Sequence, residues 1–390
     1  MDIAFYTNTN GQDVTHASYS ARRVFKKCER EFELTYIQGW GQREDRAATL
    51  FGKCIEAAIQ YHEGCDRKPG TCVEKFAELW EQVKTVPHFE KLSYTAAEGD
   101  YAQLTVAGRD LSRLYEIMAP RLPISTHPKA LFQQTWRKEI FPGTAYSGLD
   151  NKAIIDCLSF PKWDHPMLPK GEHDGREFVE LIIDIKTAGA DLATNLVGLD
   201  PQLGEYGWQG RIPLVAFLWL VKKSPELKKG SRVTLLEDLG GHGAGFEMVV
   251  LFALDGKATL GDTALYDQYD KEQRDVKGKA LDAMKYRYTT YDTVVNCLPA
   301  QITKQRLQFA AARLSEQDLI DIGRTVAQTT VEQVRAHNEK FYPRNPGIRF
   351  PDQRCNFCAM RFICLNDPAG RDANLTQRGS EWLEGVEETD

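Results

Sequence analysis

Two acidic residues and a lysine lie inside apolar segments, where burying an unpaired charge is costly. Asp184 interrupts the run Leu181-Ile-Ile-Asp-Ile185 and is followed by Lys186, while Asp150 lies in Gly148-Leu149-Asp150. Asp184 and Lys186 are two apart, so on a strand both side chains point to one face. Converging carboxylates suit Mg²⁺ or Mn²⁺, and an adjacent ammonium can orient a water or offset phosphate charge. A solvated strand face is the usual explanation of such a pair, but the apolar surroundings of Asp184 favour a functional site.

Three cysteines near the C-terminal end have the spacing Cys-x2-Cys-x5-Cys, at Cys355, Cys358 and Cys364. Nine cysteines are an odd number, and the chain shows no export signal, so structural disulfides are a poor default. Thiolates at this spacing can hold Zn²⁺ or an iron–sulfur cluster, with a fourth ligand from elsewhere in the chain. The sequence therefore predicts a metal or cluster site.

Gln202 and Tyr206 follow the Asp184 segment and are four residues apart, which places them on one face of a helix. An amide and a phenol there could hold a nucleotide against the metal. The same pair by itself is more often an ordinary surface or half-buried pair on a helix.

Apolar periodicity predicts helices first, then strands, then helices again. We expect helices over 21–34 (capped by Ser20), 47–61, 72–83 and 98–118, and strands over 131–141, 147–159 and 178–187. A helix over 202–221, kinked or divided at Pro213, a strand over 246–254 and helices over 260–341 follow. This order predicts an α/β core with helical segments on both sides.

Composition limits the class of protein. The chain has 390 residues, 42% hydrophobic and 27% charged, which excludes a wholly disordered chain. Lys+Arg 49 against Asp+Glu 55 gives −6, but residues 366–390 hold seven acids and two arginines, a net of −5. The remainder is nearly neutral, which is compatible with a local basic channel for DNA. No stretch approaches the roughly 20 apolar residues that cross a bilayer, so we expect a soluble, cytoplasmic protein without a membrane partner.

Taken together and in order, these motifs resemble the RecB-type nucleases of the PD-(D/E)xK superfamily, in the branch with an iron–sulfur cluster. That branch includes CRISPR-adaptation nucleases and nuclease domains of recombination helicase complexes. The resemblance spans residues 18–365. It rests on an N-terminal Ser-x-Ser segment with a lone cysteine and on the later motifs: Ser18, Ser20, Phe25, Cys28, Phe32, Leu34, Tyr36, Gly148-Leu149-Asp150, Asp184-Ile185-Lys186, Gln202, Tyr206, Cys355, Cys358 and Cys364.

The resemblance implies a restriction-endonuclease-like core, with a central mixed sheet flanked by helices, over residues 126–260. An N-terminal helical region would cover 1–125, a C-terminal helical region 261–365, and an acidic, mobile tail 366–390. It also implies that Cys28 joins the three C-terminal cysteines around a 4Fe-4S cluster. Such a cluster would tie the two ends of the chain together.

For the site, the resemblance implies that Asp150 and Asp184 hold the metal, with the Ile185 carbonyl as an extra ligand. Lys186 would position the attacking water, and Gln202 and Tyr206 would contact the DNA strand. The histidine of the family's Gly-x-x-x-His helix is replaced here by Glu56, which is either a further ligand or a solvated helix residue.

The implied activity is Mg²⁺- or Mn²⁺-dependent hydrolysis of DNA, as an exonuclease of a recombination, repair or viral system. No Gly-x-x-x-x-Gly-Lys-Ser/Thr motif is present, so any helicase or recombinase would be a separate partner. Two alternatives remain on the sequence alone. One is a non-catalytic nucleic-acid-binding module, and the other is a zinc-stabilised interaction protein.

Overall fold

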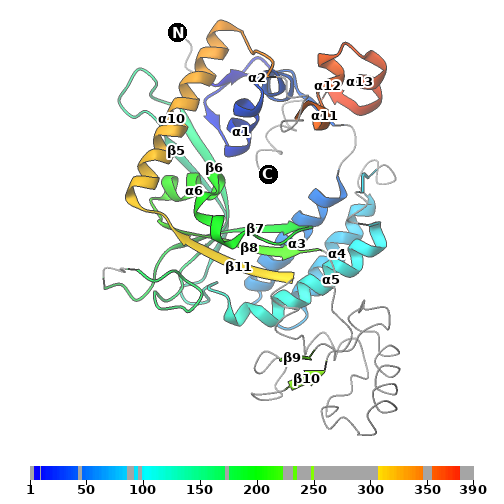
Figure 1. Cartoon of the computed structure of the whole chain (residues 1–390), viewed down its shortest axis with the longest axis vertical. Coiled ribbons are helices and arrows are strands. Elements are labelled where there is room, and N and C mark those ends of the chain that lie inside the picture. Colours follow the sequence, from blue (N-terminus) through cyan, green and yellow to red (C-terminus); the bar gives the residue numbers. More distant parts are fainter. Residues whose placement is uncertain are drawn as a thin grey trace.

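A mixed six-stranded sheet lies between two layers of helices in the computed structural model of the chain (Figure 1). The structure describes residues 4–222 except 9, 43–45, 86–91, 95–98 and 172–174, then 306–345, 354–377 and the backbone of 232–234 and 247–249. One layer contains α3 (Ala47–Gly64), α4 (Thr71–Gln82) and α5 (Tyr101–Met118), and the other α6 (Pro201–Gly210) and α10 (Glu316–Glu339). The predicted α/β class with a mixed central sheet is confirmed.

The sheet has six strands, and the two edges of its strand β6 (Asp150–Ser159) are paired to different extents. The six strands are β3 (His16–Ala17), β5 (Leu131–Glu139), β6, β7 (Leu181–Ala188), β8 (Leu214–Val221) and β11 (Leu307–Arg313). β7 and β8 are parallel, and β11 runs antiparallel to β8. One edge of β6 pairs with β5, but its other edge pairs with β7 only over 157–159 and with β3 only over 150–151. In this register, residues 152–156 of that edge have no strand partner.

None of the helices within the described residues is long and apolar enough to cross a membrane. The remaining elements of the described chain are short. They are β1 (Tyr6–Thr7), β2 (Asp13–Val14), α1 (Tyr19–Lys27), α2 (Glu29–Phe32), η1 (Glu33–Ile37), β4 (Trp40–Gln42), η2 (Val83–Thr85), η4 (Ala119–Arg121), η5 (Thr194–Leu199), β9 (Arg232–Thr234), β10 (Glu247–Val249), α11 (Arg354–Phe357), α12 (Arg361–Cys364), α13 (Pro368–Asn374) and β12 (Leu375–Gln377).

Helix starts follow ordinary capping rules. Ser18 caps α1, accepting a hydrogen bond from the Ala21 N–H, so the expectation that Ser20 would be the cap is wrong by two residues. Asp100 and Gln103 form a capping box at α5. The helices predicted over 47–61, 72–83 and 98–118 agree closely with α3, α4 and α5, but the single helix predicted over 21–34 is divided at Cys28 into α1 and α2 and continues as η1.

The predicted helix over 202–221 is correct only in its first half. α6 ends at Gly210, Arg211 adopts a left-handed conformation, and Pro213 precedes the strand β8. Strand β8 is a continuous apolar run because it lies between β7 and β11 with both faces covered, which is typical of a central strand. Periodicity cannot distinguish such a short apolar run from a buried helix.

Two further expectations are corrected near the C-terminal end. Residues 307–313, which fall within the helices predicted over 260–341, form β11 because pairing with β8 overrides helix propensity. Within the tail that was expected to be mobile after residue 366, residues 368–377 form α13 and then β12, which pairs antiparallel with β4, and residues 378–390 lie outside the described part of the chain. The predicted strand over 246–254 is described only as β10, and the helices predicted over 260–305 lie outside the described residues.

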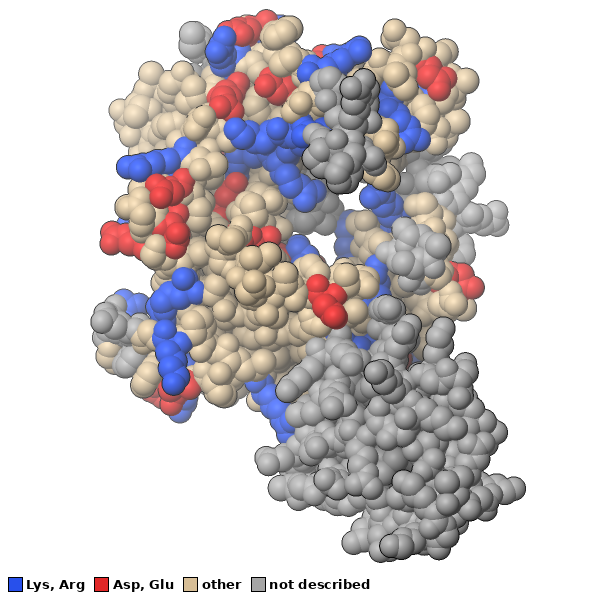
Figure 2. All heavy atoms as spheres, viewed as in Figure 1, with Lys and Arg blue, Asp and Glu red and all other residues tan. Residues whose placement is uncertain are grey.

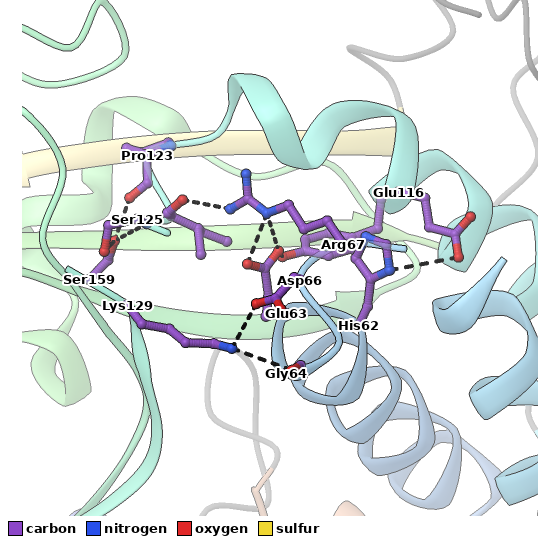
Figure 3. Close-up of polar contacts among 12 residues, drawn as sticks. His62, Glu63, Gly64, Asp66, Arg67, Glu116, Pro123, Ser125, Lys129 and Ser159 are labelled. Atoms are coloured by element: carbon purple, nitrogen blue, oxygen red, sulfur yellow. Dashed lines mark hydrogen bonds and ion pairs between the residues drawn. The ribbon is translucent and has the colours of Figure 1, made fainter. Parts of the chain in front are cut away.

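A buried polar network closes the end of α3 (Figure 3). The guanidinium of Arg67 donates to both carboxylate oxygens of Glu63 at 2.9 Å and to the Ile124 carbonyl at 2.6 Å, while the Tyr115 hydroxyl donates to Glu63 at 2.8 Å. Glu116 accepts from the Cys72 N–H at the start of α4, at 2.7 Å. These bonds hold α3, α4 and α5 together at one end and so fix how α3 lies on the sheet.

We expect Arg67→Met to destabilise this layer by roughly 3 kcal/mol, because it leaves the buried Glu63 carboxylate without its cation. Urea unfolding followed by circular dichroism measures the loss. Arg324→Met is the matched control, since its ion pair with Asp321 is exposed and should contribute little. Equal losses from the two variants would contradict the assigned role of the network.

Candidate active site

A cavity of about 410 Å³ opens between α3 and the strands β5, β6 and β7. Its polar lining comes from four separate elements, and it contains three of the four charged side chains described below. The lining residues are Ala48, Thr49, Gly52, Lys53, Glu56, Ala57, Gln60, Gln133, Ile154, Asp156, Ile185, Lys186 and Thr187. The fourth charged side chain, Asp184, lies beneath the cavity and contacts Lys186.

The cavity lies where β6 and β7 separate. Their pairing ends at Cys157 and Ile183, one residue before Asp156 and Asp184 would face each other. Beyond that point, the Ile185 N–H donates to the Asp156 Oδ2 at 2.8 Å. A side-chain carboxylate thus replaces a backbone acceptor and holds the Asp156 side chain between the two strands.

Asp184 is the most buried member of the site, with 1% of its surface exposed. Apart from the Lys186 ammonium, its carboxylate oxygens have no hydrogen-bond partner within the described part of the chain. Lys186 forms an ion pair with it, with Nζ at 3.1 Å from Oδ1, and about a third of the lysine side chain (36%) is exposed. A buried carboxylate whose one partner is an ammonium is unusual and fits a group that binds a cation.

Glu56 reaches the site from α3 because the helix approaches β7 closely. A Cβ at Gly52, one turn earlier, would lie 3.2 Å from the Thr187 Oγ1, so glycine permits this approach. The Gln133 side-chain amide donates a hydrogen bond to the Glu56 Oε1. Glu56 therefore lies in the cavity with the other charged groups rather than on a solvated helix face.

The charges of the cluster are strongly coupled. Burial raises the pKa of Asp184 to about 8, of Glu56 to about 7 and of Asp156 to about 6. Burial alone would lower the pKa of Lys186, but the carboxylates outweigh it and raise that pKa. Lys186 is therefore an ammonium at neutral pH, suited to orienting a water or offsetting negative charge rather than to accepting a proton.

Asp150 does not belong to this cluster, contrary to the sequence-based prediction. It begins β6, where it faces His16 of β3 and Glu139 of β5. Six residues of strand separate it from Asp156, which is about 20 Å. The second aspartate of the site is Asp156, and it interrupts the apolar run Ala153-Ile-Ile-Asp-Cys-Leu158 just as Asp184 interrupts its own. The sequence thus carries a signal for Asp156 as well as the Gly-x-Asp pattern at 148–150.

Gln202 and Tyr206 lie together as predicted, with the Gln202 Nε2 donating to the Tyr206 hydroxyl at 2.7 Å. They line a small cavity with Ser18, Tyr19 and Lys152, next to the free edge of β6; Ser20, Ala153 and Ile154 complete its lining. Burial and the negative charges of Asp184 and Asp156 raise the pKa of Tyr206. The pair is thus adjacent to the carboxylates.

Ile185, whose carbonyl was expected to be a metal ligand, lines the main cavity. The interaction that it makes there is the hydrogen bond from its N–H to Asp156.

The four predicted cysteines surround a second cavity, of about 420 Å³. Cys28 lies between α1 and α2, and Cys355, Cys358 and Cys364 come from the C-terminal segment. The two ends of the chain are also joined by hydrogen bonds, for example from the Arg354 guanidinium to the Lys27 carbonyl at 2.5 Å. None of the eight cysteines within the described residues forms a disulfide.

Positive side chains accompany these thiols, since Arg344, Arg354 and Arg361 line the same cavity. Burial raises the pKa of Cys358 to about 11 and also raises that of Cys364, while Arg344 and Arg30 act in the opposite direction on Cys364. Nearby arginines offset the negative charge that thiolates acquire on binding a metal.

Both sites have side chains of the types that bind metals, but these side chains are not arranged in the coordination geometry of a metal ion. Across the described ranges, no three His, Cys, Asp or Glu side chains are arranged so that they could hold an ion as they stand. The buried carboxylate of Asp184, which has few hydrogen-bond partners, fits a hard cation, and four cysteines around one cavity fit Zn²⁺ or an iron–sulfur cluster. Binding would require small movements of these side chains and the release of protons.

Comparison with known proteins adds little. No protein-family model matches the chain, and no curated protein matches it. Among solved structures, the crystal structure of SSO0001 aligns with 52% of this chain and 72% of that chain, at 13% identity and a TM-score of 0.18. At that TM-score, the match carries no argument about fold or function.

We expect Asp184→Asn to gain stability relative to the wild type as pH rises from about 4 to about 8, in metal-free buffer. In that window the Asp184 carboxyl keeps its proton when folded but is ionised when unfolded, so its contribution to stability falls with rising pH. Asparagine does not titrate. Thermal unfolding of both proteins with chelator present measures the difference, and a difference independent of pH would contradict the prediction.

Proposed function

We propose that the chain is a metal-dependent nuclease that hydrolyses DNA phosphodiester bonds and has a PD-(D/E)xK core. The observation that carries the proposal is the meeting of three carboxylates and one ammonium where β6 and β7 separate. Asp156 comes from β6, the Asp184-x-Lys186 pair from β7, and Glu56 from α3. Carboxylates that bind a cation, with an ammonium beside them, are the groups that this chemistry needs. The motif order described above supports the same class.

In this proposal Glu56, Asp156 and Asp184 hold Mg²⁺ or Mn²⁺. The cation would supply Lewis acidity at a phosphate oxygen and a lower pKa for a bound water. The Lys186 ammonium orients that water or offsets charge on the phosphate, and its raised pKa keeps it charged. Gln202 and Tyr206, at the neighbouring cavity, contact the DNA strand.

The charge distribution supports a nucleic-acid substrate. Lys and Arg side chains gather over the part of the surface occupied by α1 (Figure 2). In α1, Arg23 and Lys26 are exposed and Lys27 is half-buried, whereas Arg22 is buried. Phosphate contacts from such a surface would make binding dependent on salt. Exonuclease action and a separate helicase or recombinase partner belong to the same proposal.

The four cysteines are proposed to hold a 4Fe-4S cluster with a structural role. They lie at the junction of the N-terminal and C-terminal segments, where Leu34, Met360 and Leu375 form a small core with Cys358 and Cys364. A cluster there would restrict the unfolded chain over more than 320 residues and so stabilise the fold.

A pair of variants on one strand tests the catalytic proposal. Asp156→Asn should reduce Mn²⁺-dependent cleavage of end-labelled DNA by more than about 100-fold. Loss of a residue that only supports a metal ligand costs at most about 100-fold, and loss of a ligand itself should cost more. Asp150→Asn, on the same strand but about 20 Å away, should cleave at a near-normal rate. Mn²⁺ titration by calorimetry is measured beside the cleavage assay, on single- and double-stranded substrates.

The opposite ranking, with Asp150→Asn inactive and Asp156→Asn active, would overturn the assignment of the site. Absence of cleavage by the wild type with either metal, alongside tight DNA binding, would instead favour a non-catalytic binding module.

The cysteine assignment has its own test. Protein purified without oxygen should contain about four iron and four sulfide ions per chain, and Cys358→Ser should lose the visible absorption and unfold at a lower temperature. Cys65→Ser is the control, because Cys65 lies at the end of α3 and does not line the cavity of the four cysteines. Stoichiometric zinc without iron would show a zinc site instead.

A further inference from the structure

Gln133 has an unusual backbone for its position. It lies within β5 at a φ of +51°, in the left-handed region that a side chain makes costly. The pairing of β5 with β6 is regular on both sides, at Phe132–Cys157 and Gln134–Ile155, but skips Gln133 and Asp156. The strand pair is therefore interrupted at two residues that line the same cavity.

The interruption changes the layer against which β5 packs. Phe132 packs with the core of α3, α4 and α5, whereas Trp136 packs with the core of α6 and α10. In a regular strand two residues four apart would lie on one face. Gln133 is the left-handed residue between them, and its side chain faces the cavity of the carboxylates. Strained residues persist where the surrounding structure requires them, often at functional sites.

The contact made by Gln133 is specific. Among the described residues, its amide is the one hydrogen-bond partner of Glu56, and it reaches Oε1, leaving Oε2 for another ligand. The other two carboxylates are fixed in different ways. Asp156 accepts the Ile185 N–H, and Asp184 is enclosed beside Lys186. Glu56 has the longest side chain of the three, so it loses the most freedom on becoming ordered.

We propose that Gln133 is a positioning residue that holds the Glu56 carboxylate toward the cation site. The inference rests on the proposed function and adds a residue that does not itself bind the metal. An amide suits the task because it donates a hydrogen bond without adding charge or competing for the ion. The left-handed backbone at residue 133 is strained, and it directs the side-chain amide toward Glu56.

Gln133→Gly separates positioning from folding. Glycine adopts a φ of +51° without penalty, so the variant should unfold at the same or a higher temperature than the wild type. Without the amide, its Mn²⁺ dissociation constant by calorimetry should rise about 10-fold or more, as for other groups that orient a ligand. Gln133→Asn keeps the amide but shortens the side chain, and it should show a similar loss.

A double-mutant cycle identifies the partner. In a Glu56→Ala background, Gln133→Gly should have no further effect on Mn²⁺ binding, because the group that it positions is gone. The control is Gln328→Ala, which removes the same kind of amide–carboxylate bond, to Glu332, from the exposed surface of α10. It should leave Mn²⁺ binding unchanged.

The two hypotheses fail in different ways. If Glu56→Ala and Asp156→Asn weaken Mn²⁺ binding but Gln133→Gly does not, or if the cycle is additive, the positioning role is wrong and the proposed function stands. If none of these variants changes Mn²⁺ binding, the metal site itself is wrong.

Discussion

The hydrogen bond from the Ile185 N–H to the Asp156 carboxylate is the interaction on which the candidate site depends. In a continuous antiparallel pair that N–H would face a backbone carbonyl of β6, and the space between the strands would be closed. Because a side chain takes the place of the carbonyl, β6 and β7 separate without leaving a buried donor unpaired. The separation creates the cavity and leaves Asp156 and Asp184 side by side at its base.

Gathering three carboxylates in a partly buried cavity opposes folding, and the raised pKa values of all three express that cost. The surrounding structure supports the arrangement from several directions. Lys186 lies beside Asp184, while Gly52 lets α3 pack closely on β7. At the far end of α3, the Glu63–Arg67 network fixes the helix against α4 and α5. A cation would remove the repulsion that these contacts only limit.

The sequence predicted most of the fold but less of the geometry of the site. Helices α3, α4 and α5 and strands β5, β6 and β7 were expected because their periodicity is strong. Strand β8 was predicted as helix because a strand that is buried on both faces is apolar at every position and lacks the alternation that identifies a strand. Asp184 and Lys186 were found from their types and spacing, and Glu56 from its place at the histidine position of the family that the chain resembles. Asp156 was missed because its position depends on where two strands separate, and Gln133 because only the folded backbone reveals its strained conformation.

Helix α1 links the two candidate sites and explains why its basic residues have different roles. It begins at Ser18 and Tyr19, which line the small cavity with Gln202 and Tyr206, and it ends at Cys28. Midway along it, the buried Arg22 donates to Glu205 of α6, to Asn151 of β6 and to the Ala17 carbonyl.

A buried arginine with three acceptors is held by the fold and is not available to a phosphate, whereas on the same helix Arg23 is exposed and Lys26 forms an exposed ion pair with Glu332. Because α6 also carries Gln202 and Tyr206, the Arg22 contacts set their position relative to α1. A ligand held by Cys28 at the far end of that helix would therefore support the Gln202–Tyr206 pair through one rigid element, without lying near it.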